Sequence, residues 1–240
     1  MKLSRRRFLL GALLPSLALF TTYSYLETNN LQITKLKLGL GVKIAFLVDT
    51  HLHSIGEIEE RIIDTVNKEK PDVILHGGDV IDEYTGSLKL VEEYFSALES
   101  KEKYAVLGNH DYWCRRTDEL VRILKKLGFK ILRDEVIKTS FGTLYGVDWR
   151  DSRIYQVVGK ANFVLAHDPN VADYISEQCF ILAGHTHGGV VIGRVTVLSN
   201  SHYTRGLYEL ENGSVLYVSR GLGQIIPLRP TSPLELVYLE

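Results

Sequence analysis

The sequence predicts an α/β fold with two mixed β-sheets. In the first half of the chain, short apolar runs alternate with amphipathic segments, which is typical of β-α-β units around a parallel sheet. In the second half, the apolar runs are short and separated by turn residues, a pattern that indicates β-hairpins. The chain has 240 residues, of which 45% are hydrophobic and 24% charged. Such a chain buries a sizeable core, which excludes a disordered protein and a small disulfide-held protein.

The elements follow in order from these patterns. Five short apolar runs are predicted as buried strands: Val42–Val48, Val73–Leu75, Tyr104–Leu107, Asn162–Ala166 and Phe180–Ala183. Three amphipathic segments are predicted as helices: Glu57–Lys70, Ser87–Ser100 and Arg115–Leu127, the last closed by Gly128. Four later runs are predicted as hairpin strands: Val190–Val197, Gly206–Leu210, Ser214–Ser219 and Leu234–Leu239. The two kinds of pattern together favour two sheets packed face to face.

The N-terminal segment differs from the rest of the chain. Residues 8–26 carry no charge and follow three consecutive arginines. A run of this length spans, or nearly spans, a bilayer as a helix. Cleavage near residues 16–18 would leave a very short apolar region, so we expect residues 1–26 to form an uncleaved membrane anchor. Residues 27–240 contain no repeat, heptad or linker, and we expect them to form one monomeric catalytic domain.

The basic residues before this segment leave its role open. Ser4 followed by Arg5 and Arg6 resembles a twin-arginine export signal, which would place the domain outside the cytoplasm. The alternative is a basic flank that only sets membrane topology. The net charge of the chain is −1, and the first 26 residues carry four cations and no acid, so the rest carries −5. An acidic domain of this kind is not expected to bind nucleic acid.

A polar side chain that can bind a metal follows each of the five predicted buried strands. In an open α/β sheet the carboxyl ends of the strands lie along one edge, so we expect these side chains to meet there. The residues are Asp49 and His51 after the first strand, Asp79 after the second, Asn109 and His110 after the third, His167 after the fourth, and His185 and His187 after the last.

The residue types favour a metal centre with more than one ion. Imidazoles combined with two carboxylates and an amide suit Zn, Mn or Fe, whereas an oxygen-only set would suggest Mg or Ca. In an extended segment alternate side chains face the same way, so D-x-H and H-x-H are each expected to direct two ligands to one side. With two ions and seven ligands, one carboxylate is shared. A shared carboxylate holds the ions about 3.5–4 Å apart, the spacing used for in-line displacement at phosphorus.

The ordered set D-x-H, G-D, G-N-H-D, H and G-H-x-H resembles the calcineurin-like metallophosphoesterase superfamily, over Val42 to His187. The tail Val218–Gly223 is similar to that of its small bacterial membrane-associated branch. The resemblance implies a four-layer αββα sandwich that binds two metal ions and hydrolyses phosphoesters. By position it assigns Asp49, His51 and His187 to the first metal, Asp79 to the bridge, and Asn109, His167 and His185 to the second metal. It makes His110 a catalytic residue that acts at the phosphate without binding a metal.

The sequence lacks the motifs that mark two other branches of the superfamily. The Arg-Gly pair that protein phosphatases have after the bridging aspartate is absent, and Asp82 stands where purple acid phosphatases have a metal-binding Tyr. The branch includes an enzyme that cleaves UDP-2,3-diacylglucosamine in lipid A synthesis, which implies a lipid-linked diester or pyrophosphate as substrate. That nucleotide sugar is cytoplasmic, so the cytoplasmic face of the inner membrane is the alternative location. A phosphodiesterase or phosphatase for soluble nucleotides and a silent membrane scaffold are the alternative functions.

Further polar residues near these motifs have less certain roles. We expect His76 to pack near the site, and Asp82 and Asp111 to orient imidazoles or fix loops. His53 and His202 either line the substrate entrance or lie in solvated loops. Arg220 either meets phosphate or caps a turn.

Overall fold

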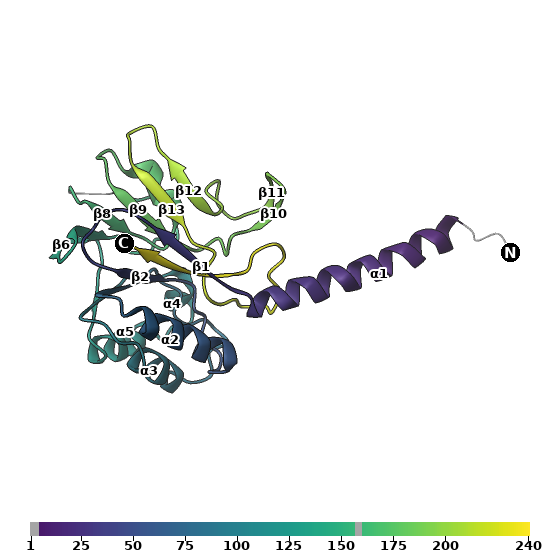
Figure 1. The fold of residues 1–240 in the computed structure, drawn as a ribbon, viewed down its shortest axis with the longest axis horizontal. Helices are drawn as coiled ribbons and strands as arrows, with labels where there is room; N and C mark the ends of the chain where they lie inside the picture. The colour runs from purple at the N-terminus through teal and green to yellow at the C-terminus, as the bar shows by residue number, and fades with distance from the viewer. Residues whose placement is uncertain (1–4, 157–159) are drawn as a thin grey trace.

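Two six-stranded mixed sheets pack against each other at the centre of the protein (Figure 1). They are seen in a computed structural model that describes residues 5–156 and 160–240, with side chains from residue 13 onward. The α/β class with two mixed sheets is therefore confirmed. The chain also forms a separate two-stranded hairpin and a long N-terminal helix.

The first sheet has the strand order β1-β14-β2-β3-β4-β5. Its strands are β1 (Leu31–Leu36), β14 (Leu234–Leu239), β2 (Ile44–Leu47), β3 (Val73–His76), β4 (Glu102–Ala105) and β5 (Phe129–Ile131). Strands β2 to β5 pair in parallel, as predicted for β-α-β units. β14 pairs antiparallel with β2 and parallel with β1. The last strand therefore belongs to this sheet and not to a hairpin, because all six of its residues are buried and it needs cover on both faces.

Helices cover the outer face of the first sheet (Figure 1). They are α2 (Glu57–Glu69), α3 (Lys89–Ser96) and α5 (Thr117–Lys126), each within a predicted helix. α2 begins where the Gly56 amide donates to the Glu59 carboxylate at 2.9 Å, and it ends at Lys70, whose φ of 48° is left-handed. Side chains of β2 alternate between the two faces: Ala45 and Leu47 pack beneath the helices, while Ile44 and Phe46 pack between the sheets.

The second sheet has the order β12-β13-β9-β8-β7-β6. Its strands are β12 (Gly206–Glu209), β13 (Val215–Val218), β9 (Phe180–Ala183), β8 (Phe163–Leu165), β7 (Gly142–Gly146) and β6 (Glu135–Thr139). On its outer face, Val164, Ile181 and Leu216 pack beneath the 3-10 helix η2 (Pro169–Tyr174) and neighbouring loops. The fourth layer of the sandwich is therefore made of this short helix and loops in the described part of the chain.

The sequence patterns missed several elements and shifted others. β1, β5 and the β6–β7 hairpin were not predicted, nor was α4 (Asn109–Trp113). β1, β5 and β6 are short or half-exposed, so they lack a long apolar run. The third strand pairs at Glu102–Ala105 instead of Tyr104–Leu107, although the Val106 amide still donates to His76 at 3.0 Å. The predicted strand Val190–Val197 is in fact a hairpin of β10 (Val190–Ile192) and β11 (Val195–Leu198).

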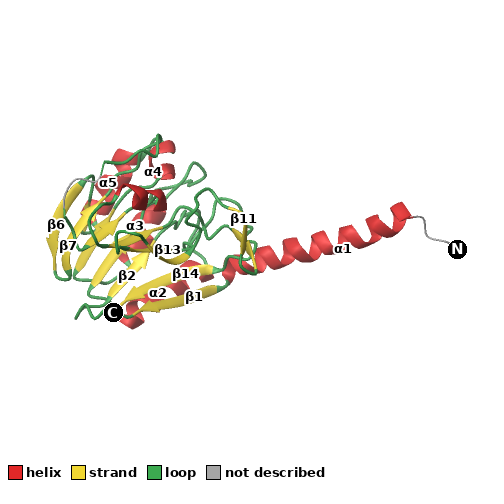
Figure 2. Ribbon diagram, turned by 90° about the horizontal axis from the view of Figure 1, so that it is seen from above, coloured by secondary structure: helices red, strands yellow, loops and turns green. Residues whose placement is uncertain are grey.

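The N-terminal helix α1 (Arg5–Leu26) projects away from the two sheets (Figures 1 and 2). A short 3-10 helix, η1 (Glu27–Asn29), joins it to β1. Among the residues that the structure describes, no helix is long and apolar enough to cross a membrane. The predicted export signal includes Ser4, which lies outside the described residues, and the arginine side chains that follow are not described either.

Candidate metal centre

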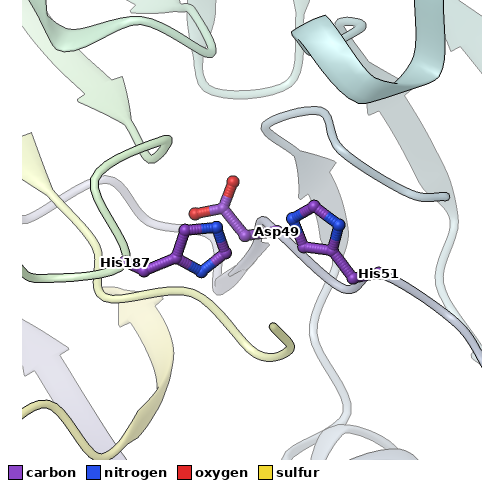
Figure 3. A group of neighbouring side chains, drawn as sticks. All are labelled: Asp49, His51 and His187. Atoms are coloured by element: carbon purple, nitrogen blue, oxygen red, sulfur yellow. The ribbon is translucent and has the colours of Figure 1, made fainter. Parts of the chain in front are cut away.

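The carboxyl ends of β2 and β9 bring together a first group of side chains. Asp49 and His51 follow β2, and His187 follows β9. Figure 3 shows the three side chains directed toward one another from two separate loops. Their ligand atoms all lie within 4.8 Å of one another; Asp49 and His51 are buried and His187 is partly exposed. This is one of two clusters with the composition of a metal site in the described part of the chain.

A second group lies at the ends of β3, β8 and β9. Asp79, His167 and His185 also place one ligand atom each within 4.8 Å of the others. The Nε2 atom of His167 lies 3.1 Å from Oδ2 of Asp79 and 3.1 Å from Nδ1 of His185. Asn109, at the start of α4, adds its Oδ1 at 3.0 Å from the same Nε2. All seven predicted ligand residues therefore meet at one edge of the sandwich.

Asp79, a member of the second group, also reaches the first group. Its Oδ2 atom is 3.1 Å from Nε2 of His167 in the second group and 3.6 Å from Nε2 of His51 in the first. Its Oδ1 atom accepts the backbone amide of His110 at 2.8 Å. This carboxylate thus has the position of a bridge between two ions.

The backbone at these residues is not extended, contrary to the expectation from the sequence. Five of the seven predicted ligands have left-handed φ angles: Asp49 (52°), His51 (40°), Asp79 (53°), His185 (70°) and His187 (48°). Non-glycine residues adopt this region rarely, and such strain gathers at functional sites. Tight turns, and not the alternation of a strand, therefore direct the side chains of D-x-H and H-x-H to one centre.

The donor atoms fit divalent or trivalent metal ions. The Nε2 atom of His51 is buried and has no hydrogen-bond partner among the described residues, while its Nδ1 lies 3.0 Å from Oδ2 of Asp82. His167 and His187 likewise place Nδ1 near the backbone carbonyls of Gly77 and Gly223, at 3.0 and 3.1 Å. A histidine ligand is held in this way when its second nitrogen binds metal. Donors about 2.1 Å from one ion lie about 3 Å apart, which is the spacing seen around His167.

Burial keeps two of the imidazoles neutral. It lowers the pKa of His185 to about 3, helped by the charge of His167, and it lowers the pKa of His187 well below its usual value. Although burial opposes ionisation of Asp79, the neighbouring His167 holds the pKa of this carboxyl below its usual range. Neutral imidazoles and an ionised carboxylate are the protonation states that bind a metal ion. Although burial opposes it, the Asp79 carboxylate raises the pKa of His167 to about 9, so this ring must lose a proton when it binds metal.

Two aspartates support the site without belonging to either group. Asp82 contacts both His51 and His53, with its Oδ2 atom 2.7 Å from Nε2 of His53. Asp111 accepts the backbone amides of Gly108, Asp79, Val80 and Ile81 at 2.8 to 3.1 Å. One aspartate therefore orients imidazoles and the other fixes the loop that carries Asp79, as predicted.

Two glycines leave room for the carboxylates. A Cβ atom on Gly108 would lie 2.2 Å from Oδ1 of Asp79. Gly221, with φ of 76°, lies against Asp49, and a Cβ atom there would be 2.7 Å from the Asp49 Cβ. Gly221 belongs to the tail motif Val218–Gly223. The backbone of this motif packs against Asp49, which explains why a glycine stands there.

The remaining predicted residues take different positions. His110 lies at the mouth of the site with Nδ1 2.7 Å from Oε2 of Glu83. His76 is buried against Phe95, and burial lowers its pKa to about 3, which agrees with a packing role. Arg220 forms an ion pair with Glu235 at 3.2 Å. His202 lies 3.3 Å from Asp173 and is more than half exposed.

A pocket of about 460 Å³ opens over the two groups. Its wall includes two tryptophans that sequence reasoning missed, Trp113 and Trp149, whose indole nitrogens both donate to Asp151, at 3.0 and 2.8 Å. Arg153 also lines it and forms a two-pronged ion pair with Asp168 at 2.6 and 2.7 Å. Isolated aromatic residues give no periodic signal, so only their position in the fold reveals them. No sequence pattern marks Glu83 either, and only the fold shows that it contacts His110.

A two-sheet α/β sandwich with two adjoining groups of metal-type ligands under an open pocket defines a candidate dinuclear metalloenzyme. Residues 42–189 match the model of the family described as calcineurin-like phosphoesterase, and the chain belongs to this family. It is therefore a metallophosphoesterase, and its family and its two clusters together indicate a dinuclear metal centre.

Two similar proteins and one solved structure can be compared with this chain. An uncharacterized metallophosphoesterase of Aquifex aeolicus is 30% identical, over 92% of this chain and 95% of that protein. A "Transmembrane protein with metallophosphoesterase domain" of Danio rerio is 26% identical over 83% of this chain, which spans only about half (53%) of that protein. A solved structure titled as a novel archaeal phosphodiesterase is 18% identical with a TM-score of 0.47, covering 75% of this chain and 84% of that one.

Proposed function

We propose that this protein hydrolyses a phosphodiester or pyrophosphate bond at a centre of two metal ions. The observation that carries the proposal is the position of the Asp79 carboxylate, within 3.1 and 3.6 Å of imidazole nitrogens in two separate ligand groups. Asp49, His51 and His187 would hold one ion, and Asn109, His167 and His185 the other, with Asp79 shared. Two such ions, of Mn, Fe or Zn, supply charge neutralisation at the phosphate and lower the pKa of water.

His110 is the residue proposed to move a proton. Water attacks phosphorus and releases a proton to solvent, the bond from phosphorus to the leaving oxygen breaks, and that oxygen takes a proton from His110, which is then protonated again from solvent. The Glu83 carboxylate lies at Nδ1 of His110, which leaves Nε2 to hold the transferable proton. The ring lines the pocket, and its centroid is 5.3 Å from that of His51. No side chain of the site needs to form a covalent bond to the substrate.

The substrate we propose is linked to a lipid, in the manner of a UDP-diacylglucosamine-type precursor of lipid A. The supporting observation is α1, whose described side chains include seven leucine, phenylalanine and tyrosine residues from position 13 to 25, 44 to 73% exposed. We infer that residues 1–26 associate with a membrane. The catalytic domain would lie outside the cytoplasm for another lipid-linked phosphoester, and at the cytoplasmic face of the membrane for a substrate of the UDP-diacylglucosamine type. Exchange of Arg5 and Arg6 for Lys tests export: a twin-arginine signal requires the arginines, whereas a topology signal does not.

A soluble nucleotide phosphodiesterase is the second candidate. The Trp113 and Trp149 rings stand edge to face, with centroids 6.4 Å apart, at the wall of the pocket, where a nucleobase can stack. The complete set of seven ligand residues disfavours a silent scaffold.

A substrate panel after metal analysis tests the proposal. The purified protein is assayed with bis(4-nitrophenyl) phosphate, 4-nitrophenyl phosphate, a dinucleotide and UDP-2,3-diacylglucosamine. We expect hydrolysis of diesters or pyrophosphates to exceed that of the monoester. Preference for the monoester would contradict the proposed reaction, and preference for the dinucleotide over the lipid would favour the second candidate.

A further inference from the structure

An apolar groove lies beside the metal centre, between the β10–β11 hairpin and the loop 224–230. It has a volume of about 320 Å³. Its wall is mostly aliphatic and includes Val190, Leu198, Ile225, Ile226, Leu228 and Pro230. Its position adjoins the pocket over the metal ligands, because His187 and Ile225 line both. A molecule with its phosphate at the metal centre can therefore extend past His187 into this groove.

Most polar groups in the wall of the groove are already paired. The buried guanidinium of Arg229 donates to the backbone carbonyls of Gly223 and Ser232, at 2.6 and 2.8 Å, and to that of Arg220. The Thr186 hydroxyl donates to the carbonyl of Thr204. A peptide would need a partner for each of its amides, whereas a hydrocarbon chain needs none. The wall therefore suits a hydrocarbon chain.

One polar atom of the wall lacks a partner. The Oε1 atom of Gln224 is buried and unpartnered in the described part of the chain. Gln224 directly precedes Ile225, the residue that lines both cavities. Because this oxygen is not exposed to the groove, it places no polar demand on a hydrocarbon chain bound there.

The outer rim of the groove joins other apolar surface. On the loop, Ile226 is 65% exposed and Leu228 44%. On the hairpin, Ile192, Val195 and Val197 are each more than 60% exposed. The same loop contacts the end of α1, because the Arg229 amide donates to the Ser24 carbonyl at 2.9 Å. Both views place the hairpin on the side of the body from which α1 projects (Figures 1 and 2).

We propose that this groove binds the hydrocarbon chain of the substrate while the attached phosphoester lies at the metal centre. The inference rests on the proposed phosphoesterase function and names its substrate class: phosphoesters that carry a linear alkyl or acyl chain. One side of the protein is apolar next to His187. It is formed by three segments that are far apart in the sequence: α1, the β10–β11 hairpin and the loop 224–230. A chain that leaves a lipid surface on this side reaches the metal centre through the groove.

The test uses the full-length, metal-loaded protein and 4-nitrophenyl alkyl phosphates with methyl, butyl and octyl chains. Hydrolysis releases 4-nitrophenolate and leaves the alkyl phosphate, so the measured step is the same for each. Burial of one methylene is worth about fourfold in affinity, and we expect kcat/KM to rise at least tenfold from butyl to octyl. The double variant Ile226→Asn/Leu228→Asn should reduce the octyl-to-methyl ratio to near one.

Two control variants separate the groove from other apolar surface. Val136→Asn removes an apolar side chain that is 41% exposed on β6 and should keep the full ratio. Leu17→Asn/Phe20→Asn on α1 should also keep it. Loss of the ratio in the α1 variant with retention in the groove variant would assign the chain to α1 and overturn the proposal.

Binding of decylphosphonate, measured by calorimetry, gives a second readout that does not depend on turnover. We expect it to bind at least tenfold more tightly than methylphosphonate, and the difference to vanish in the Ile226→Asn/Leu228→Asn variant. If the methyl diester is hydrolysed but chain length changes neither kcat/KM nor affinity, the groove proposal is wrong. If decylphosphonate binds in the groove but no ester is hydrolysed, the proposed function fails instead.

Discussion

The carboxylate of Asp82 lies 3.0 Å from Nδ1 of His51, and the opposite nitrogen of that ring is buried without a hydrogen-bond partner among the described residues. The pair fixes which nitrogen faces the ligand group. An unpaired buried imidazole nitrogen costs free energy unless something binds it, and a metal ion is the partner that its neighbours Asp49 and His187 can share.

The first prediction follows from this pair. Asp82→Asn should weaken metal affinity at the first site about tenfold or more, because the ligand ring loses its charged acceptor. Metal titration of the stripped protein measures the change. Asp72→Asn is the matched control, since Asp72 pairs with Lys101 at 2.9 Å away from the site. Equal affinity in the Asp82 and Asp72 variants would show that Asp82 has no part in binding.

A second prediction separates His110 from the ligands. His110→Asn should lower kcat about a hundredfold and leave the metal content unchanged, because the residue moves a proton and does not bind an ion in this account. Glu83→Gln should give a smaller loss in the same direction, since Glu83 only holds the ring at 2.7 Å. The readouts are steady-state kinetics and metal analysis of the same samples. Loss of metal together with activity in the His110 variant would make this residue a ligand.

The third prediction concerns the space beside the bridging carboxylate. Gly108→Ala places a Cβ atom 2.2 Å from Oδ1 of Asp79, so Asp79 must move and both ions should bind more weakly. We expect a loss of at least tenfold in kcat/KM and a metal content below two. Gly86→Ala is the control, because a Cβ atom there meets nothing within 4 Å. Full activity in the Gly108 variant would mean that the position of Asp79 is not critical.

A fourth prediction concerns the N-terminal helix. A chain that starts at Glu27 should still hydrolyse bis(4-nitrophenyl) phosphate, because all seven proposed ligands lie between Asp49 and His187. It should leave the membrane fraction, where we expect the full-length protein. Cell fractionation and the soluble assay check both statements. A shortened chain that stays with the membrane would place the attachment elsewhere, for example on the β10–β11 hairpin.

The positions of the ligands were predictable from the sequence, but their geometry was not. Each ligand follows an apolar run, and the strand order that follows from β-α-β units brings those ends together, as seen for Asp49 and Asp79. The left-handed φ of both residues leaves no sequence signal, because aspartate usually adopts other conformations. The expected extended D-x-H geometry was therefore wrong, although the predicted meeting of its side chains was right.

Contacts between distant segments account for the other omissions. β14 joins β2 across most of the chain, and no local pattern reveals this pairing. Trp113 and Trp149 come from different halves of the sequence, and their rings meet edge to face beside Asp151, which accepts both indole N–H groups. The groove beside His187 likewise forms between the β10–β11 hairpin and the loop 224–230, and the sequence of neither segment predicts it.

The central claim is tested most directly by the number of metal ions bound per chain. Mass spectrometry measures this number for the purified protein and for its Asp79→Asn variant. The account predicts two Mn, Fe or Zn ions per chain, loss of hydrolysis on chelation, and recovery on adding metal back. Asp79→Asn should lose at least one ion and nearly all activity, and His187→Ala should lose the first ion. Full activity in a protein that holds no metal, or two tightly bound ions in the Asp79→Asn variant, would contradict the account.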